Sequence, residues 1–260
     1  MTSLPFFQVD AFAADAPLTG NPAAVMPLDR WLDDATMQAI AAENNLSETA
    51  FTVPSARADA DYDLRWFTPT TEVDLCGHAS LATGHILVTG QPLRFATRSG
   101  ILTVTRADDL VELDVPAFAV APGELSGLHE ALGVSGPTFV HDGGSASVIV
   151  LLDDEAAVRA VRPDFTKLRV FDRLVIVTAP GDTHAIASRV FAAYHGIDED
   201  PVTGAAHAAL VPFWAERLGR ESFSAVQASK RSGLLHCRLT GDRVILGGRC
   251  QTVIVGQFQL

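Results

Sequence analysis

Glu48 lies where an expected helix gives way to an apolar strand, within residues 45–51. A carboxylate beside a buried strand is costly to keep ionised, so its pKa tends to rise. A raised pKa suits a group that takes up and releases protons near neutral pH. Glu48 is therefore a candidate general acid/base, and an exposed loop glutamate is the alternative interpretation.

Two other segments place small residues at the expected starts of helices. One reads Asp-Leu-Cys-Gly-His-Ala over residues 74–79, and the other reads Asp-Glu-Asp-Pro-Val-Thr-Gly-Ala over residues 198–205. A helix N-terminus presents unpaired N–H groups and the positive end of the helix dipole, which together bind carboxylates or phosphates. Glycine lets a ligand approach the backbone, and His78 could add a hydrogen bond or a proton. The alternatives are a small-residue turn that packs a helix on a sheet, and ordinary capping by acidic residues.

Many short strands around a few helices must position these residues. The periodicity and the turn signals predict helices at residues 34–43, 77–88, 124–132 and 204–218. Strands are expected at residues 4–12, 23–26, 50–53, 62–67, 93–97, 101–105, 111–115, 138–141, 146–152, 170–178, 222–227, 234–239, 244–247 and 252–258. Residues 196–201 are expected to form a loop, and His207 is expected on the helix body rather than at a ligand.

The chain divides into two similar halves. Residues 116–123 carry two prolines and a glycine among small apolar residues, which is typical of a linker. On each side, a glycine-containing helix start is followed by a run of strands, which indicates a duplicated domain. The predicted domains are residues 1–118 and 119–260, and the last strand is allowed to cross back to the first half.

Composition and charge exclude several classes of function. The chain has 260 residues, of which 48% are apolar and 19% are charged, and its formal net charge is −12. This composition is typical of a globular protein, and the acidic balance disfavours nucleic acid and anionic membranes as partners. The N-terminal residues lack the features of a signal peptide, and no apolar stretch is long enough to span a bilayer, so a cytoplasmic protein is expected.

Cysteines and known motifs give little support for a metal or a nucleotide. The three cysteines, Cys76, Cys237 and Cys250, form no Cys-x-x-Cys pair, so neither a disulfide framework nor a zinc site is expected. No Gly-x-Gly-x-x-Gly, P-loop or His-Glu-x-x-His motif is present. We therefore expect no metal and no cofactor.

The ordered set of motifs resembles the phenazine-biosynthesis PhzF-like family. The matching segments include Leu-Ser-Glu-Thr around Glu48, Cys-Gly-His at residues 76–78 and Asp-Pro-Val-Thr-Gly at residues 200–204. Further matches lie at residues 6–12, 20–25, 64–69, 72–75, 227–233 and 244–248. They follow the family's order and span nearly the whole chain.

The resemblance implies an α/β (α+β) fold of the diaminopimelate epimerase-like type. Two pseudo-symmetric halves, each with a mainly antiparallel sheet wrapped around a central helix, would flank a shared cleft. The helices that start at Gly77 and Gly204 would be the central helices. Members of the family are commonly homodimers, so a homodimer is expected.

The resemblance also implies roles for individual residues. Glu48 matches the family's proton-shuttling glutamate, His78 matches a histidine that lines the site, and Asp200 matches an aspartate that contacts the substrate. The implied substrate-binding set is His78, Asp200, Gly77, Cys76, Thr203, Gly204 and Ala205.

Two departures from relatives qualify these roles. The phenazine enzyme has a serine where this sequence has Ala205, which removes one hydrogen bond to the substrate. The epimerase cousins use one thiol in each half, whereas the second half here has Thr203 opposite Cys76. A hydroxyl without an activating partner is too weak a base, so the two-thiol mechanism is not expected.

Residues and resemblance together favour a cofactor-independent isomerase. Its expected reaction is a double-bond shift by proton transfer on a small carboxylate-bearing substrate. The alternatives are a non-catalytic small-acid-binding protein, and a lyase or hydrolase built on the same cleft.

Overall fold

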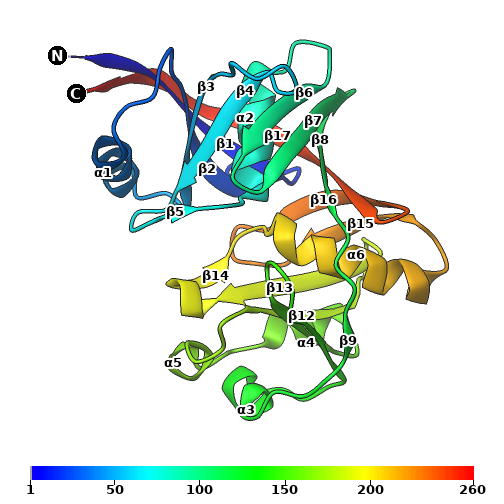
Figure 1. Ribbon diagram of the computed structural model, residues 1–260. Helices are drawn as coiled ribbons and strands as arrows, with labels where there is room; N and C mark the ends of the chain where they lie inside the picture. Colours follow the sequence, from blue (N-terminus) through cyan, green and yellow to red (C-terminus); the bar gives the residue numbers. More distant parts are fainter. Residues whose placement is uncertain (1) are drawn as a thin grey trace. The chain divides into compact units, whose positions relative to one another are not determined.

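The computed structural model describes residues 2–260, and they form two compact units (Figure 1). The first unit contains the residues up to Asp114 together with Gly247–Leu260, and the second unit is Val115–Leu246. The chain therefore passes from one unit to the other twice. The sequence analysis placed a single boundary at residues 118 and 119 and allowed the last strand to return.

The first unit is a mixed, mainly antiparallel sheet. Strand β1 pairs antiparallel with β2 and with β17, β2 runs parallel to β3, and β3 pairs antiparallel with β4. Strand β4 pairs antiparallel with β5 and parallel with β6, and β7 and β8 extend the sheet as an antiparallel meander. The bounds are β1 Ser3–Ala13, β2 Asn21–Pro27, β3 Glu48–Pro54, β4 Tyr62–Phe67, β5 Glu72–Val73, β6 Leu93–Thr97, β7 Gly100–Ala107, β8 Leu110–Pro116 and β17 Arg243–Gln259.

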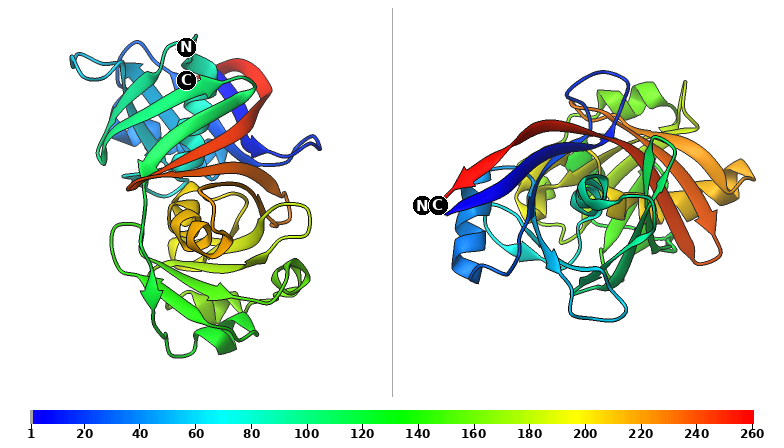
Figure 2. Two further views of the ribbon diagram at one scale, coloured as in Figure 1. Left: turned by 90° about the vertical axis from the view of Figure 1, so that its right-hand side faces the viewer. Right: turned by 90° about the horizontal axis from the view of Figure 1, so that it is seen from above.

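The sheet of the first unit wraps around helix α2 (Gly77–Leu87), which is seen nearly end-on in the right-hand view of Figure 2. Seven consecutive residues of this helix, from His78 to Gly84, are buried. A β-carbon at Gly84 would lie only 2.3 Å from Cγ1 of Val104 on β7, so the glycine permits the close approach of helix and sheet. Helix α1 (Asp34–Asn44) is capped by Asp33 and packs its buried side chains in a separate apolar cluster.

The second unit repeats the same sequence of strand pairings. Strand β10 pairs antiparallel with β11, β11 parallel with β12, β12 antiparallel with β13, β13 antiparallel with β14 and parallel with β15, and β15 antiparallel with β16. The bounds are β9 Ala121–Pro122, β10 Thr138–His141, β11 Ser147–Leu151, β12 Leu174–Pro180, β13 Ile186–Ala192, β14 Ile197–Asp200, β15 Ser222–Gln227 and β16 Gly233–Thr240. The short helices are α3 Leu128–Leu132, α4 Glu155–Ala160, α5 Phe165–Leu168 and the 3-10 helix η1 Ala193–His195.

Helix α6 (Gly204–Leu218) is the central helix of the second unit and is buried along most of its length. It contains Pro212, which has no N–H to donate to the carbonyl of Ala208 one turn earlier. The N–H of Phe118 donates to that carbonyl instead, at 2.9 Å. The segment after β8 is thereby attached to the helix at the position where the proline leaves an acceptor open.

These observations confirm the predicted fold class, with a mainly antiparallel sheet around a central helix in each half. Several local predictions were wrong. The residues expected to form a loop before α6 include strand β14, because its backbone pairs with β13. Helix α3 was expected to begin at residue 124 but begins four residues later, at Leu128. Strand β12 was expected to begin at residue 170 but begins at Leu174, after helix α5 and a turn.

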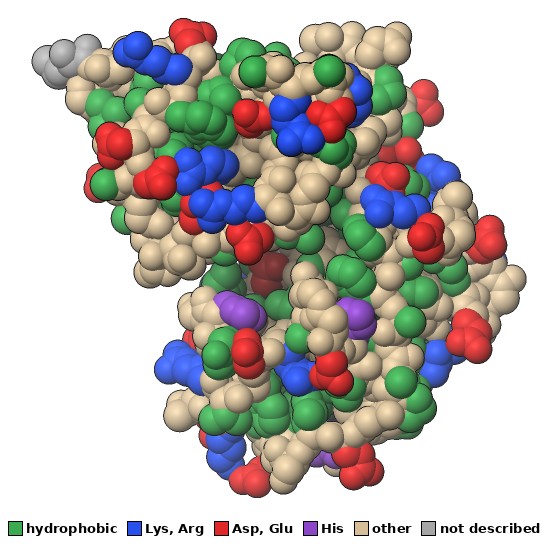
Figure 3. Space-filling view, in the orientation of Figure 1, with side chains coloured by type: hydrophobic (Ala, Val, Ile, Leu, Met, Phe, Trp, Pro, Cys, Tyr) green, Lys and Arg blue, Asp and Glu red, His purple; other side chains and the backbone are tan. Residues whose placement is uncertain are grey.

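Charged side chains of both signs alternate over the face drawn in Figure 3. Many arginines pair with carboxylates, such as Arg65 with Glu72 at 2.7 Å and Arg249 with Asp109 at 2.7 Å. Within residues 2–260, no helix combines the length and apolarity that crossing a membrane requires.

Candidate active site

Glu48 is the first residue of β3, paired in register with Ala23 of the neighbouring parallel strand β2. The turn after α1 delivers it to the sheet, and only 9% of its surface remains exposed. Its Oε2 atom lies 3.1 Å from Nε2 of His78. Glu48 therefore lies where the sequence predicted it, between a helix and a buried strand.

His78 is the second residue of α2 and is 5% exposed. Its Nδ1 atom lies 3.2 Å from Nδ2 of Asn21 and 3.5 Å from the sulfur of Cys76. Asn21 opens β2 and is fully buried. The first unit thus gathers Glu48, Cys76 and His78, three residues that the sequence analysis singled out.

Asn21 was not among the predicted site residues. The hydroxyl of Ser47 donates to its Oδ1 at 3.3 Å, so its NH₂ group faces His78. In the neutral form of the ring, that amide can donate to Nδ1, and the ring proton then lies on Nε2, toward Glu48. Ser47 donates to Asn21, Asn21 contacts Nδ1 of His78, and Nε2 of His78 faces Glu48, so these four side chains form one polar series. The only sequence signal for this role was an asparagine before a proline in the segment at residues 20–25.

Burial and charge shift the pKa values of two of these groups. Burial raises the pKa of the Cys76 thiol to about 11, and the nearby Glu48 carboxylate acts in the same direction. Burial alone would lower the pKa of His78, but the facing charges of Cys76 and Glu48 and the hydrogen bonds to both outweigh it and raise that pKa well above 6.5. In both cases the negative charge of Glu48 favours the protonated form of its neighbour.

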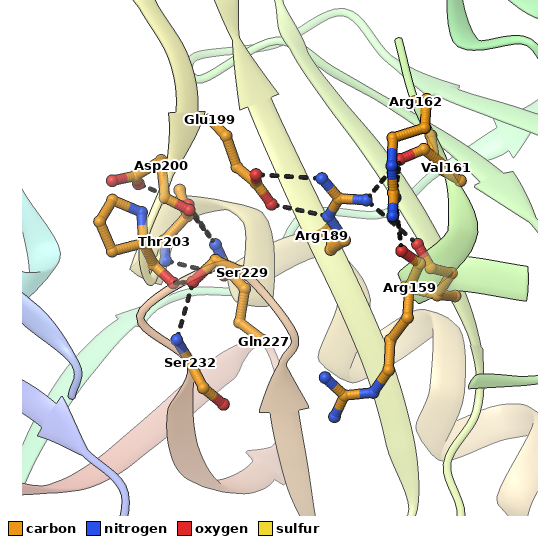
Figure 4. Close-up of polar contacts among 12 residues, drawn as sticks. Arg159, Val161, Arg162, Arg189, Glu199, Asp200, Thr203, Gln227, Ser229 and Ser232 are labelled. Carbon is orange, nitrogen blue, oxygen red and sulfur yellow. Dashed lines mark hydrogen bonds and ion pairs between the residues drawn. The ribbon is translucent and has the colours of Figure 1, made fainter. Parts of the chain in front are cut away.

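The second unit builds a different polar cluster around the start of α6 (Figure 4). The hydroxyl of Thr203 donates to Oδ2 of Asp200 at 2.5 Å and therefore does not cap the helix. The buried side chain of Gln227, at the end of β15, accepts the Thr203 N–H at 2.9 Å and donates to the Asp200 carbonyl at 2.7 Å. Gln227 also donates to the Thr203 hydroxyl at 3.2 Å. Gln227 was missed by the sequence analysis.

A buried arginine anchors the strand that carries Asp200 (Figure 4). Arg189 on β13 pairs with both carboxylate oxygens of Glu199, at 2.7 Å and 3.0 Å, and donates to the Val161 carbonyl at 2.7 Å. The turn after β15 is fixed by Ser229, whose hydroxyl donates to the Pro201 carbonyl at 2.8 Å. Together these contacts fix the backbone on both sides of Asp200.

The repeated topology shows which chemistry the two halves do not share. Cys76, Gly77 and His78 begin α2 just as Thr203, Gly204 and Ala205 begin α6. Glu48 opens β3, and Leu174 opens the equivalent strand β12. The second unit therefore lacks an ionisable side chain at each position equivalent to those of Glu48, Cys76 and His78.

Gly77 and Ala205 are half-buried, and Gly204 is buried. The predicted site residues thus form two clusters, one in each unit. That both clusters serve one substrate stays a prediction.

Among the described residues, Glu48, Cys76 and His78 also form the one group of His, Cys, Asp or Glu side chains whose geometry could hold a metal ion.

Comparisons with known proteins agree with this arrangement. The family described as "Phenazine biosynthesis-like protein" matches residues 9–256. An uncharacterized isomerase from Pseudomonas aeruginosa is 48% identical, with 99% of each chain covered. The crystal structure of a phenazine biosynthesis protein of the PhzF family from Enterococcus faecalis superposes with a TM-score of 0.91, at 43% identity and with 100% of both chains covered.

The fold extends to more distant enzymes. A hydroxyproline epimerase from Agrobacterium vitis has a TM-score of 0.63 at 13% identity, covering 98% of this chain and 92% of that one. This likeness concerns the fold alone. It agrees with the epimerase-like architecture that the sequence analysis expected.

Proposed function

Because the chain belongs to the phenazine biosynthesis-like protein family, we propose that it is an isomerase that shifts a double bond by moving a proton, without a cofactor. The proposed substrate is a small molecule that carries a carboxylate. The main support is the buried contact between Glu48 and His78, at 3.1 Å. Similarity to relatives named as isomerases supports the reaction class.

Glu48 is the proposed base and acid. As a carboxylate it removes a proton from a saturated carbon, and the electrons of the broken C–H bond become a new C=C bond. The existing double bond moves its electrons to a more distant carbon, which takes the proton back from Glu48. No net oxidation or reduction occurs, and the carboxylate is regenerated.

His78 is proposed to hold the Glu48 carboxylate in place and to stabilise its charge. Its raised pKa favours the imidazolium, which places a positive charge 3.1 Å from Oε2 of Glu48. The side chain of Asn21 fixes the ring from the other side. A base with a fixed orientation contributes typically about 10²–10⁴-fold to the rate.

A single acid/base residue implies that the proton leaves and returns on the same face of the substrate. An inversion would need a second base on the opposite face, and the second unit has Thr203, Ala205 and Leu174 at the equivalent positions. The backbone N–H groups near Gly77 and Gly204 are proposed to bind the carboxylate, and Asp200 is proposed to contact the substrate.

The test is solvent exchange in D₂O, followed by NMR over a panel of small amino, hydroxy and cyclohexadiene carboxylic acids. The proposal predicts deuterium incorporation or double-bond migration for at least one compound. Saturable binding of several compounds, with no exchange in any of them, would indicate a binding protein and overturn the proposal.

A further inference from the structure

We propose that Cys76 and His78, with Glu48 on the other side of the imidazole, form a site for a thiophilic divalent cation such as Zn²⁺. The three residues offer one thiol, one imidazole and one carboxylate, which are the side chains that zinc prefers. One ligand atom of each residue lies within 4.8 Å of the other two. The proposed isomerase reaction gives Cys76 no step, so the thiol is available for this second role.

The distance between sulfur and nitrogen fits a single ion. The sulfur of Cys76 lies 3.5 Å from Nδ1 of His78. Zinc holds sulfur at roughly 2.3 Å and imidazole nitrogen at roughly 2.0–2.1 Å, so two such ligands of a tetrahedral ion lie about 3.5 Å apart. The separation of these two atoms therefore matches that of two ligands of one ion.

Glu48 lies at the Nε2 side of the His78 ring, away from the Nδ1 atom that faces Cys76. Its carboxylate faces Nε2 of His78 at 3.1 Å, and a proton on Nε2 leaves the lone pair on Nδ1, the atom that lies near the sulfur. Carboxylate, imidazole and metal commonly occur in this order, and the carboxylate strengthens the bond to the metal. Asn21, which now faces Nδ1 with its NH₂ group, would present Oδ1 after rotation of the amide.

The charges also balance. A bare divalent ion is costly to bury unless opposite charges accompany it. The thiolate of Cys76 and the carboxylate of Glu48 supply two negative charges, which match the charge of Zn²⁺. The thiol proton is released to solvent when the ion binds.

The experiment uses Co²⁺ as a spectroscopic probe of the full-length protein without substrate. The wild type is expected to bind one Co²⁺ per chain and to develop the near-ultraviolet charge-transfer band of a cobalt–thiolate bond. Cys76→Ser should lose the band. Cys250→Ser, which changes the other, half-buried cysteine in the first unit, should retain it.

Titration calorimetry with Zn²⁺ tests the role of the carboxylate. Glu48→Gln is expected to weaken Zn²⁺ binding by about 10–100-fold, because the imidazole loses its charged partner. Absence of the cobalt band in the wild type, its persistence in Cys76→Ser, or an unchanged Zn²⁺ affinity in Glu48→Gln would overturn the proposal.

This inference deepens the proposed function, and the two can fail separately. The cobalt and zinc measurements need no turnover, so they remain informative if no substrate is found.

Discussion

The Nε2 atom of His78 and the Oε2 atom of Glu48 lie 3.1 Å apart, and both residues are at least nine-tenths buried. Each group is the charged partner that makes burial of the other tolerable. The contact joins the start of α2 to the start of β3, so it belongs to the fold as well as to the candidate site. Its removal should therefore affect stability as well as chemistry.

Replacing His78 by asparagine should destabilise the protein in a pH-dependent way. The loss of one partner of a buried ion pair costs about 3–5 kcal/mol. Because the pKa of His78 is raised above 6.5 in the folded state, its contribution is complete below about pH 6.5 and is lost as the pH rises through the folded pKa. Urea unfolding of wild type and His78→Asn from about pH 6 to pH 9 should show a difference that shrinks with pH. A difference that is constant or that grows would contradict the assignment.

His207 should produce the opposite dependence. Burial lowers its pKa to about 4, against the effect of its hydrogen bond to the Thr203 carbonyl. Between about pH 6.5 and pH 4, His207 is protonated in the unfolded chain but neutral in the folded chain. The stability that is present above about pH 6.5 is therefore lost as the pH falls toward 4. The loss amounts to about 3 kcal/mol at about 1.4 kcal/mol per pKa unit.

The control for this prediction is His207→Asn, which can keep a donor to the Thr203 carbonyl but does not titrate. Its free energy of unfolding should lack this acid loss when both proteins are measured from about pH 4 to pH 7. Parallel curves for the two proteins would show that His207 does not control the acid sensitivity.

Gln227 should be a strong stabilising residue of the second unit. Its side chain satisfies the buried N–H of Thr203 and the carbonyl of Asp200. Gln227→Ala removes the partner of the Thr203 N–H, at about 1–3 kcal/mol, and one hydrogen bond to the Asp200 carbonyl. The exposed Gln251 is a matched control, and Gln251→Ala should change the free energy of unfolding by less than about 0.5 kcal/mol. Equal effects of the two substitutions would contradict the assigned role.

Gly84 should tolerate alanine only when its neighbour is trimmed. Alanine favours a helix by about 1 kcal/mol over glycine, but its β-carbon would lie 2.3 Å from Cγ1 of Val104. Gly84→Ala is therefore expected to destabilise by about 1–3 kcal/mol through overpacking. In a double-mutant cycle with Val104→Ala, the double variant should be more stable than the sum of the two single effects predicts. Simple additivity would show that the contact is relaxed elsewhere.

The sequence predicted the features that local chemistry controls. The starts of α2 and α6 were predicted because glycine and small residues mark them, and the place of Glu48 in the fold was predicted because a helix ends and an apolar strand begins beside it. Strand β13 was missed because Ser188 and Arg189 interrupt its apolar residues, although all seven of its residues are buried.

The remaining site residues depend on distant neighbours. Asn21 meets His78 from 57 positions away, and Gln227 meets Thr203 from 24 positions away. An amide side chain looks the same in a loop and in a buried network, so neither residue carries a signal of its own. Their roles follow from the strand order, which brings β2 beside α2 and β15 beside the start of α6.

The central claim is that Glu48 moves the proton. The most direct test compares deuterium incorporation from D₂O by wild type, Glu48→Gln and Glu43→Gln, which changes an exposed glutamate of the same unit. The account predicts that Glu48→Gln remains folded and binds substrate but loses exchange by about 10²–10⁴-fold, whereas Glu43→Gln matches the wild type. Exchange at the wild-type rate in Glu48→Gln would contradict the account.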